Sequence, residues 1–129
     1  MTANTSGSKK EKGSRLERFI ATRLRQLGLD GNARRMIGSG AFDGYKGDIY
    51  APDVPLTFEA KNNENHSIWK EWEQAKNQEK PLRPACLVIS GNFRPTLAVV
   101  DLETLLDLLL EIKDLTAKLR GKEGANPNK

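Results

Sequence analysis

The segment LTFEAKN alternates apolar and polar side chains, a pattern that fits a β-strand with one buried face and does not fit a helix. Phe58 and Ala60 fall on one side of the expected strand, whereas Glu59 and Lys61 fall on the other. The core must therefore lie on the Phe58 side. Glu59 and Lys61 therefore either face solvent or form part of a functional site.

The segment KGDIYA, followed by the turn APDVP, predicts a neighbouring strand and a hairpin centred on Asp53 and Val54. In that register Asp48 lies directly opposite Glu59. Opposed carboxylates destabilise a sheet by about 0.2–1 kcal/mol when exposed, and by more when desolvated. A hard divalent cation such as Mg²⁺ (or Mn²⁺) would offset the repulsion, and Lys61 could reach a phosphate oxygen from the same face. A solvated hairpin face is the alternative for this pattern taken alone.

The remaining patterns predict alternating helices and strands. A first helix begins after Ser14 and ends at Gly28, and a second covers most of HSIWKEWEQAKNQEK. The runs ACLVIS and TLAVVDL read as buried strands, and a final helix begins near Leu102. We therefore predict one α/β domain at residues 13–120, with a central mixed β-sheet of about five strands flanked by helices in the order α-β-β-β-α-β-β-α. Disordered tails are expected at 1–12, which is basic, and at 121–129.

The final helix is more apolar than a single packing surface requires, because leucines widen its stripe on both sides. Burial against the sheet is the favoured interpretation. The alternative is a surface shared between two copies of the chain.

Charge and cysteine content narrow the possible partners. The chain has 129 residues and a formal net charge of +4, and its first fifty residues carry ten lysines and arginines against five acids. Clustered positive charge favours nucleic acid, although a solubilising surface is the alternative. The single cysteine, Cys86, lies in an apolar run and predicts a buried thiol in a reducing compartment. No membrane span or signal peptide is expected, which favours the cytoplasm.

The pattern of Asp48 followed by Glu59-Ala60-Lys61 resembles the PD-(D/E)XK nuclease signature. Over residues 13–100 the order of motifs is most similar to the archaeal-type Holliday junction resolvases of archaea and phages. Their counterparts here are a helix bearing Glu17, the basic strand ARRMI and the loop Ser39-Gly40-Ala41. Gly47 stands where the family has proline. The resemblance implies a restriction-endonuclease-like fold.

The resemblance also implies roles for individual residues. Asp48, Glu59 and Glu17 would bind metal and take part in catalysis with Lys61, and Gln74 could position water. The residues expected to contact DNA are Arg15, Arg18, Arg34, Arg35, Ser39 and Lys46.

Alternatives stand beside several of these roles. Glu17 could instead close a capping box with Ser14, and Gln74 could be an ordinary helix-surface residue. Trp69 could stack on bases, whereas Trp72 belongs to the core stripe. Because Arg34 and Arg35 alternate on a strand, at most one of them faces the site.

The function that follows is metal-dependent cleavage of four-way DNA junctions by a homodimer that hydrolyses two phosphodiesters. The alternatives are another PD-(D/E)XK nuclease acting in repair, restriction or processing, and a non-catalytic DNA-binding module.

Overall fold

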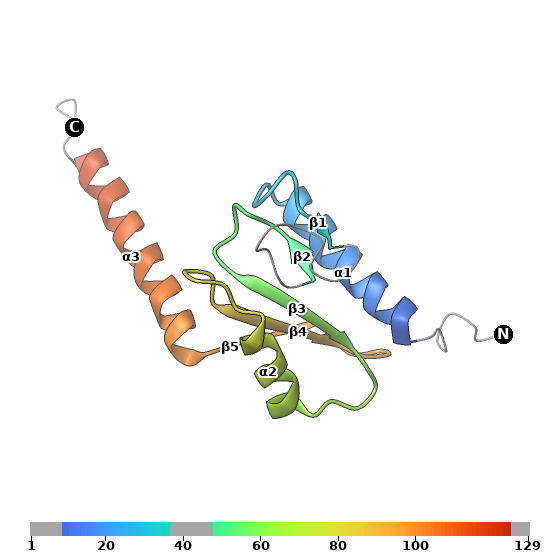
Figure 1. Ribbon diagram of the computed structural model, residues 1–129. Coiled ribbons are helices and arrows are strands. Elements are labelled where there is room, and N and C mark those ends of the chain that lie inside the picture. The colour runs from blue at the N-terminus through green and yellow to red at the C-terminus, as the bar shows by residue number, and fades with distance from the viewer. Residues whose placement is uncertain (1–8, 37–47, 125–129) are drawn as a thin grey trace.

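The computed structural model describes residues 9–36 and 48–124, and its elements follow the predicted order (Figure 1). Within these two ranges, three helices and five strands make up an α/β fold that is compatible with a restriction-endonuclease-like arrangement. The elements are α1 (Lys9–Gln26), β1 (Arg34–Arg35), β2 (Ile49–Tyr50), β3 (Thr57–Asn62), α2 (Ile68–Asn77), β4 (Ala85–Ser90), β5 (Leu97–Val100) and α3 (Leu102–Gly124).

The strands form two ladders. In the larger one, β4 lies between β3, which runs parallel to it, and β5, which runs antiparallel. The parallel pair needs a crossover, and α2 supplies it. The smaller ladder pairs β1 with β2 in antiparallel fashion, so that Arg34 faces Tyr50 and Arg35 faces Ile49. The mixed character of the sheet is as predicted.

The predicted hairpin between residues 48 and 62 is wrong. Within the described residues β2 forms its ladder with β1, and β3 forms its ladder with β4. The connection between β2 and β3 is instead held near the C-terminal end of α1 by Asp30, whose buried carboxylate accepts hydrogen bonds from the backbone amides of Asn32 (2.8 Å) and Asp53 (2.9 Å). These contacts come from outside the segment, so its own turn residues could not reveal them.

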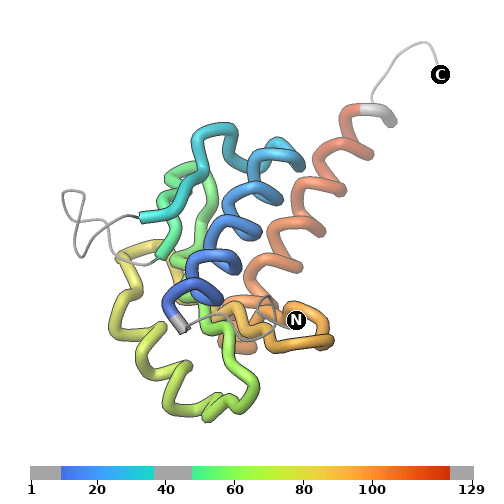
Figure 2. The backbone as a smooth tube through the Cα atoms, turned by 90° about the vertical axis from the view of Figure 1, so that its right-hand side faces the viewer, coloured from blue at the N-terminus to red at the C-terminus, as the bar shows by residue number. Residues whose placement is uncertain are grey.

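Helices cover both faces of the larger ladder. Along β4, Cys86 and Val88 face a core shared with α1, whereas Leu87 and Ile89 face a second core that contains Ala75 of α2. Phe58 and Ala60 of β3 join the α1 core, and Trp72 packs on the α2 core, as predicted. Figure 2 shows α1 running alongside the β1 and β2 segments. The thiol of Cys86 is buried, as predicted, and its burial raises its pKa to about 11.

The first helix begins earlier than predicted. It starts at Lys9 and takes in residues predicted to form a tail, so Ser14 lies inside the helix and cannot be its N-cap. The capping-box interpretation of Glu17 is therefore wrong. The C-terminal end is as expected, because Gly28 adopts a φ of 74° and its amide bonds to the carbonyl of Arg25 at 3.1 Å.

The last helix departs most from expectation. It runs to Gly124, past the predicted start of the C-terminal tail, and extends away from the rest of the fold (Figure 1). Its large apolar side chains are between 43% and 64% exposed from Leu102 to Leu119, apart from the half-buried Leu108. Burial against the sheet, the favoured prediction, is wrong. No helix in the described ranges is long and apolar enough to cross a membrane.

Candidate active site

Asp48 is fixed against the strand that carries the other acidic residue of the motif. Its backbone amide donates to the carbonyl of Phe58 at 3.0 Å, and its Oδ2 accepts from the amide of Ala60 at 2.7 Å. Both partners lie on the edge of β3 that faces away from β4. Asp48 therefore meets Glu59 through the edge of β3, without the hairpin that the sequence suggested.

Glu59 is the most strongly perturbed carboxyl group of this region. Its side chain is only 13% exposed, and burial, followed by the charge and hydrogen bond of Asp48, raises its pKa to about 8. The ammonium of Lys61, 4.0 Å from Glu59 Oε2, acts in the opposite direction. With no cation present, the Asp48–Glu59 pair therefore retains a proton at neutral pH.

Glu17 projects from α1 toward the same group of acids. Burial and then the charge of Asp48 raise the pKa of Glu17, whereas Arg35 and Arg18 oppose the shift. Arg35 holds Glu17 directly, with its Nε 3.1 Å from Glu17 Oε1, and its Nη2 donates to Ser14 Oγ at 3.0 Å. This contact shows that Arg35 faces the site and gives Ser14 a role other than capping.

The donor chemistry of the pair suits a hard divalent cation. Two carboxylates in hydrogen-bond contact present oxygen ligands, and burial together with the charge of Asp48 raises the pKa of Glu59. Among the described residues, no group of three or more acidic, histidine or cysteine side chains is arranged to hold a metal ion. Two protein carboxylates are sufficient for Mg²⁺, which keeps several of its waters.

A pocket of about 260 Å³ lies between α1 and β1, next to Glu17. Four of its six lining residues are arginines, and the lining comprises Arg18, Ala21, Thr22, Arg25, Arg34 and Arg35. Arg34 stacks over Tyr50, with its guanidinium carbon 4.9 Å from the ring centroid, and is exposed. Such a concentration of guanidinium groups beside a carboxylate site suits the phosphates of a nucleic acid.

The other predicted residues that the structure describes do not line this pocket. Gln74 is exposed on α2 and forms no hydrogen bond with Asp48, Glu59 or Lys61 in the described part of the chain. Trp69 is 82% exposed and so is accessible to a base. Arg15 is exposed on α1. Ser39 and Lys46 lie outside the described residues.

Sequence reasoning missed two features. The first is the arginine pocket: the outer arginines of α1, Arg18 and Arg25 among them, predict a basic rim that could lie along phosphates, but they do not predict that Arg34 and Arg35 join them. The second is a buried pair, in which His66 Nδ1 lies 2.8 Å from Glu71 Oε1 and His66 Nε2 lies 2.8 Å from the carbonyl oxygen of Ser90. No local sequence pattern predicts this pair.

Comparison with known proteins identifies a family for this chain. The family described as "Phage putative PDDEXK endonuclease" matches residues 8–120, which is most of the chain. No curated protein and no solved structure matches. The matched range includes α1, the Asp48–Glu59 pair and Lys61. The chain therefore belongs to this phage PDDEXK endonuclease family, and with it to the PD-(D/E)XK nuclease superfamily.

Proposed function

We propose that this protein is a divalent-metal-dependent DNA endonuclease with Asp48, Glu59 and Lys61 at its centre. The observation that carries the proposal is the contact between Asp48 and the buried Glu59, beside the ammonium of Lys61; burial and then the charge of Asp48 raise the pKa of Glu59 to about 8. A buried acidic pair with a neighbouring cation is expected where a metal and a phosphodiester meet. Family membership supports the same reaction class.

Each residue has a distinct part. Asp48 and Glu59 would hold Mg²⁺ or Mn²⁺, and the cation would supply charge to activate water and to polarise the scissile phosphate. Lys61 offsets negative charge that develops on the phosphate in the transition state. Glu17, held by Arg35 at 3.1 Å, assists by orienting a water molecule next to the pair.

The arginine pocket provides the path for the DNA backbone. Arg18 and Arg34 are exposed and line the pocket from α1 and β1. Arg35 is held by Glu17 and is half-buried. We assign Arg18 and Arg34 to phosphate contacts, and Arg35 to positioning Glu17.

The finer proposal is that the substrate is a four-way DNA junction and that the enzyme acts as a homodimer. It is supported by the resemblance that spans Glu17, the basic strand, Asp48 and Glu59-Ala60-Lys61. A junction presents two equivalent strands, and two subunits related by a two-fold axis would present two sites to them.

The test compares a synthetic four-way junction with a linear duplex of the same sequence, each with Mg²⁺, Ca²⁺ or EDTA. Wild-type protein should cut the junction in Mg²⁺ only, and Glu59→Gln should bind it without cutting. Equal cutting of both DNAs would overturn the junction proposal and leave a general nuclease. Binding without cleavage in Mg²⁺ or Mn²⁺ would favour a DNA-binding module.

A further inference from the structure

The apolar face of α3 has no partner in the described structure. The helix has 23 residues and makes no extensive contact with any other described element. Monomeric proteins rarely leave a contiguous leucine surface of this kind in water, and a long helix usually gains its stability from a packed face.

Six residues of α3 are spaced as a coiled-coil seam, and Leu106, Leu108, Leu110 and Leu115 widen the apolar surface around it. Positions alternate at spacings of three and four along the helix, as the a and d positions of a heptad do. The seam consists of Leu102, Leu105, Leu109, Ile112, Thr116 and Leu119. Its one polar member is satisfied within the helix, because Thr116 Oγ1 donates to the carbonyl of Ile112 at 2.7 Å. The whole seam can therefore be buried without an unpaired hydroxyl.

The charges of α3 are separated along its length. From Asp101 to Ile112 the chain carries acids and no base, whereas from Lys113 to Gly124 it carries four bases and two acids. A parallel pair of such helices would place like charges together. An antiparallel pair would place the acidic half of each helix beside the basic half of the other, which stabilises it.

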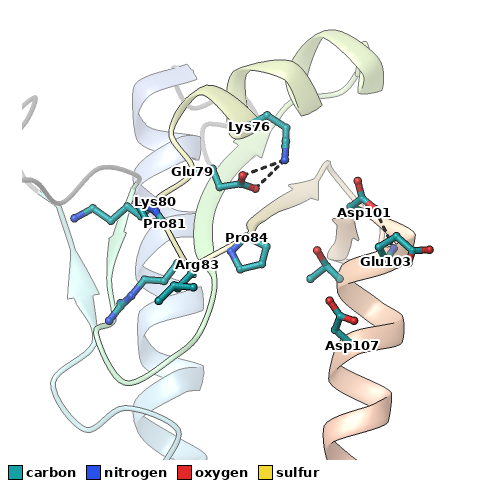
Figure 3. Close-up of a pocket in the computed structure, with 11 residues that line it drawn as sticks. Lys76, Glu79, Lys80, Pro81, Arg83, Pro84, Asp101, Glu103 and Asp107 are labelled. Atoms are coloured by element: carbon teal, nitrogen blue, oxygen red, sulfur yellow. Dashed lines mark hydrogen bonds and ion pairs between the residues drawn. The ribbon is translucent and has the colours of Figure 1, made fainter.

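The acidic half of α3 is open to a partner. Figure 3 shows Asp101, Glu103 and Asp107 along α3, across a cleft of about 500 Å³ from the loop that carries Arg83 and Pro84. On the far wall, Lys76 is paired with Glu79 at 3.0 Å. The three acids form no ion pair with the described residues. Glu103 and Asp107 lie away from the seam and line this cleft, whereas Asp101 flanks the seam, so its charge is available to a basic side chain of a partner.

We propose that α3 is the dimerisation element and that its partner is α3 of a second copy of this chain, antiparallel. The seam fits in one register: Leu102 packs against the partner's Leu119, Leu105 against the partner's Thr116, and Leu109 against the partner's Ile112. Asp101 then lies beside the partner's Lys122. The proposal rests on the proposed function only for the purpose of the dimer, because the pairing itself requires no nuclease activity.

Sedimentation and light scattering test the pairing. Wild-type protein should be a dimer, and Leu109→Asp, at the centre of the seam, should weaken it by about a hundredfold or more because carboxylates are buried near the two-fold axis. Leu110→Asp is the matched control. Leu110 is 57% exposed on the same helix but lies outside the seam, and the dimer should persist. A monomeric wild type, or equal loss in both variants, would overturn the proposal.

Disulfide formation between variants tests the orientation. Leu105→Cys and Thr116→Cys proteins should cross-link when mixed, and neither should cross-link alone, because like positions lie about 16 Å apart along an antiparallel pair. Cross-linking of either variant with itself would indicate a parallel pair and would overturn the proposal. Wild-type protein, whose single cysteine is buried, is the control.

The same proteins separate this inference from the nuclease proposal. Glu59→Gln should form a normal dimer without cutting DNA, and Leu109→Asp should be monomeric. A wild-type dimer that cuts no DNA would refute the nuclease and support the α3 pairing. A wild-type monomer that cuts DNA would refute the α3 pairing and support the nuclease.

Discussion

The carboxylate of Asp48 accepts a hydrogen bond from the backbone amide of Ala60 at 2.7 Å, at the residue that separates Glu59 from Lys61. One strand thus presents two side chains of the site and also orients the third residue through its backbone. This contact does not depend on which side chain stands at position 60. Asp48 and Glu59 therefore stay together despite their repulsion.

The stability of the metal-free protein should decrease as the pH rises. The folded pKa of Glu59 is about 8 and its ordinary value is 4.5, so the folded state binds more protons between these values. The contribution of Glu59 to the free energy of unfolding in EDTA should therefore be fully present below pH 4.5 and be lost as the pH rises through about 8. Denaturant titrations measure this dependence.

Glu59→Gln should remove that part of the pH dependence and stabilise the metal-free protein at high pH. Glu73→Gln, on the exposed face of α2, provides the control and should leave the dependence unchanged. If Glu59→Gln retained the wild-type slope, Glu59 would not be the titrating group.

Divalent-cation binding should release a proton. A cation held by Asp48 and Glu59 displaces the proton of the pair, so its affinity should rise about tenfold per pH unit up to about pH 8. Calorimetry in buffers of different ionisation enthalpy measures the release. Asp48→Asn should lose the binding. Affinity that does not vary with pH would argue against this pair as the site.

Glu17→Gln should reduce cleavage by about ten- to a hundredfold, the usual cost of losing a residue that supports a metal site. Glutamine still accepts a hydrogen bond from Arg35 but carries no charge. Single-turnover cleavage at saturating DNA measures the change. Glu11→Gln, on the exposed side of the same helix, should cut normally. Wild-type rates in Glu17→Gln would leave Glu17 as a structural partner of Arg35.

Arg18→Ala and Arg34→Ala should each weaken DNA binding, for all sequences alike. Each should also reduce the slope of log affinity against log salt concentration by about 1, because one phosphate contact is lost. Fluorescence anisotropy across a salt series measures both quantities. Arg94→Ala, on the connection between β4 and β5, is the control. An unchanged slope would exclude the arginine pocket from the DNA path.

The His66–Glu71 pair should stabilise the protein in mild acid. Burial alone would lower the pKa of His66, but its hydrogen bonds to Glu71 and to the carbonyl of Ser90 raise it overall. This contribution is fully present below pH 6.5 and is lost as the pH rises through the folded pKa. His66→Ala should cost about 1–3 kcal/mol, because it leaves buried polar groups without a partner. Denaturation measures the loss, and an NMR titration of the ring measures the pKa.

The sequence predicted those features that depend on local pattern. The alternation along LTFEAKN placed Phe58 and Ala60 in the core and Glu59 on the opposite face, and the alternation of Arg34 and Arg35 left one of them for the site. The order of helices and strands followed from periodicity alone. Local sequence pattern is sufficient to predict which side chains of a strand are buried when the strand has one apolar face.

Contacts between distant segments could not be predicted in this way. The pairing of β3 with β4 goes together with the crossover helix α2 and with the hydrogen bond that the Asp53 amide donates to the carboxylate of Asp30, and these contacts join segments far apart in sequence. The connection between β2 and β3 runs from Ala51 to Leu56 and lacks the two-residue turn motif that typically closes a β-hairpin. The wide apolar stripe of α3 indicated that this helix packs against another surface. It did not indicate that the sheet of the same chain leaves the stripe exposed.

The parallel pairing of β3 with β4 also sets the order of events during synthesis. Strand β3 carries Glu59 and Lys61, but the strand that pairs with it through the larger ladder begins only at Ala85 and ends at Ser90. A nascent chain that has not yet released Ser90 from the ribosome has every acidic residue of the site and no sheet to hold them. The candidate site is therefore expected to form only after the chain has emerged from the ribosome as far as Ser90.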